Sequence, residues 1–272
     1  MAKRAIARMR VSRTEWLTPH MIRVVLRGPF VDNGFTDKYV KLMFLRPDVE
    51  YPEPIDLDEI RRDFLREQWP TTRTYTVRWA DAATGEFAID FVTHGDEGIA
   101  APWAAAAQPG DEVIVRGPGG AYAPDPAAAW HLLVGDESAI PAIGAALEAL
   151  PAGVSARAFV QVADESEVQK LASPGEVEIT WLYRTDHPTP AAAGEALVEQ
   201  VRTLEFLPGD VQVFVHGEAG FVAGLRRHLT AERGVPREAL SISGYWRRGK
   251  NEDGWQAEKA ETRRQEEATN RA

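Results

Sequence analysis

The first half of the chain is a series of short apolar runs in which β-branched residues are frequent. Turn residues separate these runs, as at Gly28-Pro29, Thr84-Gly85 and Pro109-Gly110-Asp111. Runs of this length and composition, bounded by Gly and Pro, predict β-strands. The predicted strands cover residues 21–27, 39–45, 73–79, 86–92 and 112–116. Several short strands at this spacing predict a small antiparallel barrel.

The pattern changes after residue 124 to an alternation of apolar strands and amphipathic helices. Strands are predicted over residues 131–134, 156–162, 177–183 and 211–215, and helices over 140–150 and about 221–232. This alternation predicts a parallel sheet covered by crossover helices. We therefore expect a barrel domain over residues 1–124, an α/β domain over 125–243, and a C-terminal segment over 244–272. That last segment is predicted to be a basic turn followed by a charged helix from residue 252 to 271, lying over the cleft.

Composition narrows the classes of function. With 44% hydrophobic residues the chain can bury a core, and its net charge of −10 argues against nucleic acid as the main partner. The absence of cysteine excludes disulfides, thiolate metal sites and cysteine nucleophiles. Redox chemistry would therefore need a bound cofactor.

The N-terminus and the overall hydropathy give no sign of a membrane protein. Residues 1–4 lead into mixed polar sequence rather than an apolar segment, and nowhere do eighteen apolar residues run together. We expect a cytoplasmic protein without membrane insertion.

The segment Arg73-Thr74-Tyr75-Thr76 carries the first candidate chemistry. On a strand, Arg73 and Tyr75 project from the same face, so a guanidinium able to bind a diphosphate stands beside a ring able to cover an aromatic cofactor. Thr76 adds a hydroxyl nearby. The alternative is an ordinary cross-strand surface pair.

A second candidate follows about twenty residues later, between Asp90 and Trp103. A strand end, Gly95 and Gly98, and a predicted helix through residues 103–107 would present free backbone N–H groups to an anion. One interpretation of the segment is therefore a diphosphate-binding loop. The alternative is a plain loop followed by a helix.

The full set of motifs resembles the siderophore-interacting protein family of ferric siderophore reductases. The motifs that carry the resemblance are Tyr39-Val40-Lys41-Leu42, Arg73-Thr74-Tyr75-Thr76, Phe91-Val92-Thr93-His94-Gly95 through Trp103, Pro109-Gly110-Asp111, Gly117-Pro118-Gly119-Gly120, Gly135-Asp136-Glu137-Ser138-Ala139-Ile140-Pro141 and Gly244-Tyr245-Trp246-Arg247-Arg248-Gly249. Their order and spacing cover nearly the whole chain.

The resemblance implies a ferredoxin-reductase-like architecture. Its parts would be a six-stranded antiparallel flavin-binding barrel and a parallel-sheet α/β domain for a nicotinamide dinucleotide. Arg73 would pair with FAD phosphate, Tyr75 would pack on the isoalloxazine, and the turn from Gly98 to Trp103 would hold the diphosphate. The cofactor-binding residues implied in this way are Arg73, Thr74, Tyr75, Thr76, Asp90, Val92, His94, Gly95, Gly98, Ala100, Ala101, Trp103, Asp136, Ser138 and Ala139.

Two features of the sequence depart from a simple cofactor pattern. The family usually has Gly-Pro-Ala-Ser where this chain has Gly98-Ile99-Ala100-Ala101, so a hydroxyl that could touch phosphate is absent. The loop at residues 135–141 follows a strand, where a doubly wound domain meets its dinucleotide, yet Asp136 and Glu137 would repel a pyrophosphate. Whether NADH or NADPH is the donor stays open.

The remaining candidates concern substrate and metal. Lys41, Arg247, Arg248 and Lys250 are predicted to attract an anionic ferric siderophore, although the C-terminal cations could equally form a solvated turn. His94 has no second ligand at metal spacing, so no resident metal site is predicted. No catalytic side chain is predicted either, because electrons would pass through the flavin.

These inferences predict a reductase that takes electrons from NADH or NADPH through FAD to siderophore-bound iron. Reduction would release the iron because oxygen donors hold Fe(III) more tightly than Fe(II). Two alternatives remain: an FAD-dependent reductase of a ferredoxin-like partner, and a non-redox siderophore-binding protein.

Overall fold

The computed structural model describes residues 5–95 and 98–250, together with residues 252, 254, 255, 258, 259 and 261. These residues fall into two compact units. The first consists of Met1–Pro124, Pro141–Leu150 and Ser166–Ser173, and the second of Asp125–Ile140, Pro151–Glu165 and Pro174–Ala272. The predicted helix over 252–271 lies mostly outside the described residues, and those described within it are helical.

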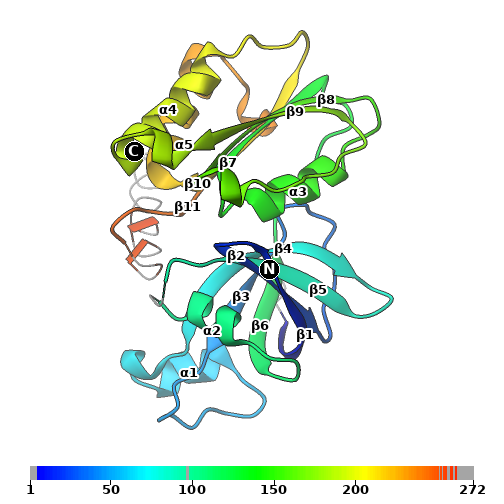
Figure 1. Ribbon diagram of the computed structural model, residues 1–272. Coiled ribbons are helices and arrows are strands. Elements are labelled where there is room, and N and C mark those ends of the chain that lie inside the picture. The colour runs from blue at the N-terminus through cyan, green and yellow to red at the C-terminus, as the bar shows by residue number, and fades with distance from the viewer. Residues whose placement is uncertain are drawn as a thin grey trace, which may run out of the picture. The chain divides into compact units, whose positions relative to one another are not determined.

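The first unit is built around a closed barrel of six antiparallel strands (Figure 1). Around the barrel the order is β1-β2-β5-β4-β3-β6. The strands are β1 (Ile6–Thr18), β2 (Met21–Arg27), β3 (Tyr39–Phe44), β4 (Thr71–Asp81), β5 (Glu86–Val92) and β6 (Glu112–Gly119). The prediction of a six-stranded antiparallel barrel is confirmed.

Strand β1 has no counterpart among the segments predicted from the sequence. Met9 and Val11 point into the core, whereas Arg8 and Arg10 are exposed and both pair with Glu112 of the neighbouring strand. Alternation of apolar and charged residues is typical of a strand with one wet face. The strand was not predicted because its arginines interrupt any apolar run.

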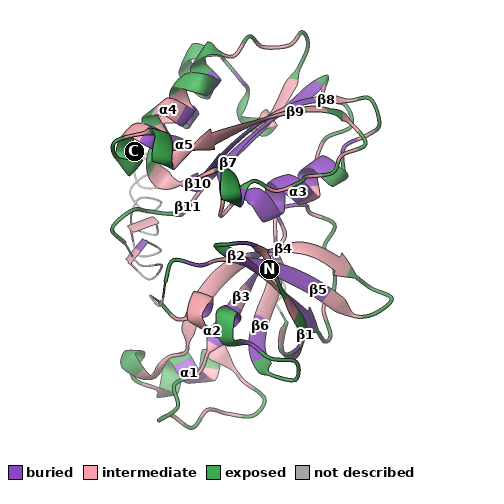
Figure 2. Cartoon of the chain, in the orientation of Figure 1, coloured by how far each residue is buried: buried purple, intermediate pink, exposed green. Residues whose placement is uncertain are grey.

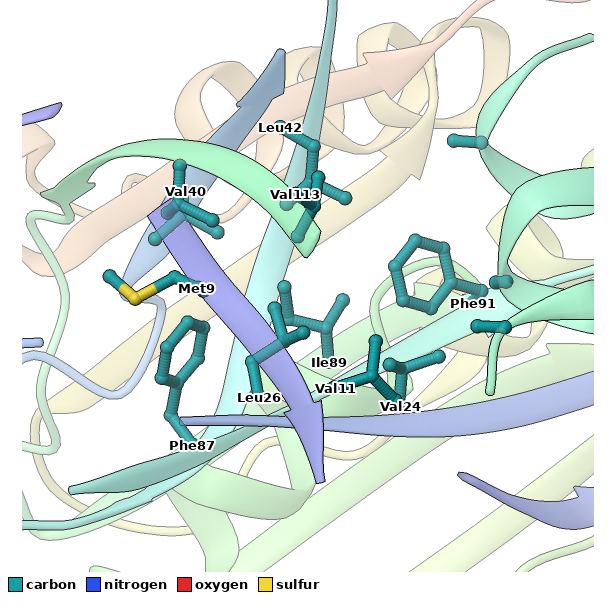
Figure 3. Packing of buried hydrophobic residues seen from close by; sticks show 14 of the residues in the cluster. Met9, Val11, Val24, Leu26, Val40, Leu42, Phe87, Ile89, Phe91 and Val113 are labelled. Atoms are coloured by element: carbon teal, nitrogen blue, oxygen red, sulfur yellow. The ribbon is translucent and has the colours of Figure 1, made fainter. Parts of the chain in front are cut away.

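The barrel interior is filled by side chains rather than left as a channel (Figure 3). Leu26, Val40, Leu42, Phe87 and Ile89 are completely buried there. Burial of a large apolar side chain contributes about 1.5–3 kcal/mol, so this cluster supplies much of the stability of the first unit.

Three helices complete the first unit: α1 (Leu57–Asp63), α2 (Ala100–Ala106) and most of α3 (Ile140–Glu148). Helix α1 begins at Asp56, whose carboxylate accepts the backbone N–H of Asp58 at 2.8 Å, and it buries Ile60 completely. A charge-assisted N-cap of this kind stabilises a short helix that would be marginal alone.

The second unit contains a five-stranded parallel sheet in the order β11-β10-β7-β8-β9. The strands are β7 (Trp130–Asp136), β8 (Ser155–Val162), β9 (Glu176–Tyr183), β10 (Val211–Glu218) and β11 (Leu240–Trp246). Every residue of the central strand β7 is buried (Figure 2), as expected for a strand covered on both faces. The predicted parallel sheet is confirmed.

Helices α4 (Pro190–Thr203) and α5 (Ala219–Arg227) bury their apolar stripes against this sheet. Leu197 and Val201 of α4 and Leu225 of α5 join one core with Leu132 and Val134 of β7. Strand β11 and helix α4 are additions to the predicted elements. Among the described residues, no helix is long and apolar enough to cross a membrane.

Candidate functional site

Strands β3, β4 and β5 and helix α2 bring four aromatic side chains together in the first unit. The Tyr75 ring lies on Phe91 with centroids 4.3 Å apart, and Trp103 lies 5.9 Å from both Phe91 and Phe44. Phe91 is buried, whereas Tyr75, Trp103 and Phe44 are half-buried. The cluster therefore joins the barrel core to a partly exposed aromatic surface.

Arg73 stands on the same face of β4 as Tyr75. The register pairs Arg73 with Leu42 and Tyr75 with Val40, so both side chains leave the strand on the face of these core residues. Arg73 is half-buried and donates from Nη1 to the Thr72 carbonyl oxygen at 2.9 Å. Thr74 lies on the opposite face, and Thr76 is buried.

Asp90 of β5 is held by an arginine. Its buried carboxylate receives Arg23 Nε at 2.6 Å and Arg23 Nη2 at 2.8 Å, a bidentate pair between β2 and β5. Val92 ends β5 half-buried, and His94 and Gly95 after it are exposed. Asp90 thus fixes the strand pair whose end carries the candidate loop.

In the described part of the loop before α2, residues 93–95 and 98–99, two glycines and an uncapped helix start offer backbone N–H groups. Gly95 and Gly98 have φ of +64° and +86°, conformations that favour glycine, and no atom lies within 4 Å of where a Cβ would stand. The N-cap residue Ile99 offers no side-chain acceptor to the first N–H groups of the helix, at Ala100 and Ala101. Both alanines lie at the helix start, Ala100 buried and Ala101 half-buried.

These residues fit a flavin dinucleotide. A large flat ring system matches the half-buried aromatic surface around Tyr75. Arg73 on the same face and the uncapped start of α2 suit a diphosphate.

A basic pocket lies beside the other face of β4 in the same unit. Its cations are Lys41 of β3, Arg61 of α1 and Arg116 of β6, and Met43, Ile60 and Trp69 provide apolar walls. Thr72 of β4 also lines it. The pocket and the Tyr75 surface are thus formed from alternate residues of one strand.

Lys41 and Arg116 stand directly opposite each other on paired strands. Neither has an ion-pair partner among the residues described, and no carboxylate lines the pocket. Like charges directly opposite in a sheet are destabilising. An uncompensated pair of this kind is expected where a ligand supplies the negative charge.

Of these cations only Lys41 was predicted from the sequence. Arg116 ends an apolar run and looks like an ordinary strand terminus, and Arg61 lies in a helix whose charges are mixed. Strand register brings Lys41 and Arg116 together, and register is not readable from the local pattern.

In the second unit, Asp136 at the end of β7 is a buried hydrogen-bond hub. Its carboxylate accepts from the backbone N–H and hydroxyl of Ser138, from the backbone N–H of Glu218 at 2.8 Å and from Trp246 Nε1 at 2.8 Å. Burial, together with the charge of Glu137, raises the pKa of Asp136 to about 6, although these hydrogen bonds act to lower it. The carboxylate ties the ends of β7, β10 and β11 together.

The remaining predicted residues of this loop are also structural. Ser138 donates to Asp136, and the Ala139 N–H donates to the Asp136 carbonyl oxygen at 2.9 Å. Glu137 forms a bidentate ion pair with Arg184, so its charge is compensated. The repulsion expected between this loop and a pyrophosphate therefore comes mainly from Asp136.

His216 of β10 stacks on Phe214 with ring centroids 3.9 Å apart, and its Nε2 lies 3.0 Å from Ser241 Oγ. Burial and the charge of Lys259 lower the pKa of His216 to about 3. The imidazole is therefore neutral at physiological pH.

The predicted C-terminal cations are engaged within the second unit. Arg247 and Lys250 share the carboxylate of Glu258, the latter at 3.9 Å. The backbone N–H of Arg248 donates to Glu218 Oε1 at 3.3 Å, and its Nη2 donates to the Pro190 carbonyl oxygen. This contrasts with Lys41 and Arg116, whose charges have no partner in the described chain. No group of side chains suited to a metal ion occurs among the described residues.

Comparison with known families covers almost the entire chain. A family model described as the siderophore-interacting FAD-binding domain matches residues 10–122. A second model, described as the siderophore-interacting protein, matches residues 128–249.

Individual relatives extend over the same length. A protein of Mycobacterium tuberculosis, itself uncharacterized, is 49% identical over 96% of this chain and 98% of its own. The ferric vibriobactin reductase of Vibrio cholerae is 32% identical over 91% of both chains. The crystal structure of a siderophore utilization protein from T. fusca has a TM-score of 0.78 at 35% identity, covering 92% of this chain and 96% of that one.

The fold itself is shared more widely. A ferredoxin reductase of carbazole 1,9a-dioxygenase, in its FAD-free form, has a TM-score of 0.59 at 15% identity over 86% of this chain and 66% of its own. The architecture is therefore ferredoxin-reductase-like.

Proposed function

The chain belongs to the siderophore-interacting protein family, and we propose that it is a ferric siderophore reductase. In this proposal electrons pass from NADH or NADPH through FAD to siderophore-bound Fe(III), and the ferrous ion is released in the cytoplasm. The family supplies an FAD-binding domain, and the Vibrio cholerae relative named ferric vibriobactin reductase supports the substrate class.

The observation that carries the proposal is the double role of strand β4. One face bears Arg73 and Tyr75, which suit a flavin dinucleotide, and Thr72 on the other face lines the pocket with Lys41 and Arg116. Residues suited to a redox cofactor and residues suited to an anion thus lie on the two faces of one strand, which supports the proposal.

We assign FAD to the surface formed by Arg73, Tyr75 and Trp103 and to the start of α2. When bound, FAD would accept the hydride of a reduced nicotinamide and pass its two electrons on singly. Arg73 would hold the diphosphate by a charge-assisted contact, and Tyr75 would cover one face of the ring.

We assign the ferric siderophore to the basic pocket. Lys41 and Arg116 would hold an anionic chelate and concentrate it locally on a protein whose net charge is −10. Oxygen donors prefer the hard Fe(III), so adding one electron weakens their hold on the metal. The side chains therefore contribute binding and position, and no acid or base is required.

A reduction assay with two acceptors tests the proposal. Purified protein supplied with FAD is reduced anaerobically with NADH or NADPH, and a ferric siderophore or an oxidised ferredoxin is then added with a ferrous-specific chelator. We expect the flavin absorbance to return on addition of the siderophore, together with formation of the ferrous complex.

Two outcomes would favour the alternatives. Reoxidation by ferredoxin alone would identify a reductase of a protein partner. Binding of the ferric siderophore by a protein that stays colourless with excess FAD would identify a non-redox carrier.

A further inference from the structure

The basic pocket carries a third cation whose position is set by helix α1. Arg61 lines the pocket with Lys41 and Arg116, and its guanidinium carbon lies 6.0 Å from the centre of the Trp69 ring. The pocket thus combines three positive charges with an aromatic wall.

The wall that presents Arg61 is well anchored. Its neighbour Ile60 is completely buried, and Trp69 Nε1 donates to the Phe64 carbonyl oxygen at 3.3 Å. The Tyr51 ring stacks on Phe64, and the Tyr51 hydroxyl donates to the Gln68 carbonyl oxygen at 2.6 Å. These contacts link Tyr51, Phe64, Gln68 and Trp69 to one another, so Arg61 projects from a packed segment.

Little negative charge compensates the three cations. Arg61 Nη1 lies 3.8 Å from Asp58 Oδ1, and both side chains are largely exposed. Such an exposed pair contributes little, on the order of 0–1 kcal/mol. Lys41 and Arg116 have no carboxylate partner among the described residues, so the pocket is cationic overall.

The charge of a ferric chelate depends on its donor groups. Three hydroxamates, each with one negative charge, neutralise Fe(III) completely, whereas three catecholates, each with two, leave the complex trianionic. A neutral complex would gain nothing from the cations and would leave Lys41 opposite Arg116 uncompensated. A trianionic complex with aromatic rings matches both the charge and the Trp69 wall.

We propose that the pocket selects trianionic tris(catecholate) chelates over neutral tris(hydroxamate) chelates, with Arg61 as a specificity-determining residue. This inference rests on the proposed function, because it assigns the substrate class of the same site.

Binding of redox-inert complexes tests the inference apart from turnover. The flavin-loaded protein is titrated calorimetrically with the gallium(III) complexes of a tripodal tris(catecholate) and of a cyclic tris(hydroxamate) that has no other ionisable group, so that the second complex is neutral. We expect the catecholate complex to bind at least roughly tenfold more tightly at low ionic strength, and this preference to shrink as salt is raised.

A matched pair of variants isolates Arg61. Arg61→Gln removes the pocket cation, and Arg62→Gln removes its exposed neighbour, which pairs with Asp63. We expect Arg61→Gln to weaken catecholate binding about fivefold and leave hydroxamate binding unchanged, whereas Arg62→Gln changes neither. Equal effects of the two variants would overturn the role of Arg61.

The substrate class and the proposed function can fail separately. Equal or tighter binding of the hydroxamate complex, with efficient reduction of its ferric form, would refute the substrate class and leave the reductase intact. Failure to bind either complex and to reduce either ferric form would refute both.

Discussion

Gly217 occupies a backbone position that no other residue fits. Its φ is +141°, and a Cβ there would lie 2.7 Å from Asp136 Oδ2 and 2.6 Å from Phe221 Cζ. We expect Gly217→Ala to lower the free energy of unfolding by about 2–4 kcal/mol, because backbone strain and overpacking act together. Urea denaturation followed by tryptophan fluorescence measures the change.

Gly153 of the same unit provides the control. Its φ is +77°, but nothing lies within 4 Å of its would-be Cβ. Gly153→Ala should therefore cost only about 1 kcal/mol, from strain alone. Equal costs for the two alanines would show that the contact with Asp136 is unimportant.

The buried carboxylate of Asp136 predicts a pH dependence of stability. Its pKa is raised from 3.8 to about 6, so the folded state binds the proton more tightly than the unfolded state. The resulting stabilisation is complete below about pH 4 and is lost as pH rises to about 6, by roughly 3 kcal/mol at most.

Comparison with Asp136→Asn isolates this titration. The free energy of unfolding of the wild type, relative to the variant, should fall between about pH 4 and pH 6 and then level off. Urea denaturation at several pH values provides both curves. A difference that stays constant across this range would contradict the raised pKa.

Among single residues, the sequence allowed us to predict which side chains of one strand share a face. It did not allow us to predict which side chains of different strands are in contact. Arg73 and Tyr75 share a face because two residues separate positions of equal orientation on a strand. Arg23 with Asp90 and Trp246 with Asp136 are joined only by the fold, so neither pair could be predicted.

At the scale of the elements, the pairing of β3 with β6 affects both the stability of the protein and the proposed binding of a ferric siderophore. Lys41 and Arg116 face each other in this ladder without a carboxylate between them. We expect Lys41→Gln to raise the free energy of unfolding by about 0.5 kcal/mol, because like charges no longer oppose each other. The same variant should raise KM for a ferric siderophore about fivefold and leave the flavin content unchanged.

Lys250→Gln is the matched comparison in the second unit, where Glu258 already neutralises part of the charge. It should change KM less than Lys41→Gln does. A larger effect at Lys250 would move the siderophore site to the C-terminal segment.

The two strands that escaped prediction, β1 and β11, share a physical reason. β1 alternates apolar residues with arginines, and β11 alternates Leu240 and Ile242 with serines, so neither forms an apolar run. Neither strand was predicted because polar residues interrupt its sequence, although alternation of apolar and polar residues is itself typical of a β-strand. Helix α4 carried readable signals in the Thr189 N-cap and the proline that follows it.

On the scale of the whole molecule, the change of period was sufficient to predict a barrel followed by a parallel-sheet domain, whereas the sixth barrel strand was implied only by the family resemblance. Barrel closure and the parallel sheet follow from many short-range patterns that agree with one another. The basic pocket could not be predicted in this way, because β3, β4, β6 and α1 each contribute no more than three residues to it.

The net charge of −10 makes a local group of cations important for binding an anion to this protein. An anionic chelate is repelled by most of the surface and attracted only where cations lack partners. The substrate preference should therefore depend strongly on ionic strength, as the gallium titrations would show.

The central claim is that Arg73 and the aromatic surface around Tyr75 bind FAD. The most direct measurement is a titration of the flavin-free protein with FAD, followed by quenching of flavin fluorescence, for the wild type, Arg73→Gln and the control Arg27→Gln. Arg27 is exposed on β2 and pairs with Glu86, away from this surface. The account predicts tight one-to-one binding by the wild type and control, and a loss of about tenfold or more in Arg73→Gln. A wild type that fails to bind FAD, or an Arg73→Gln variant that binds it equally well, would contradict the account.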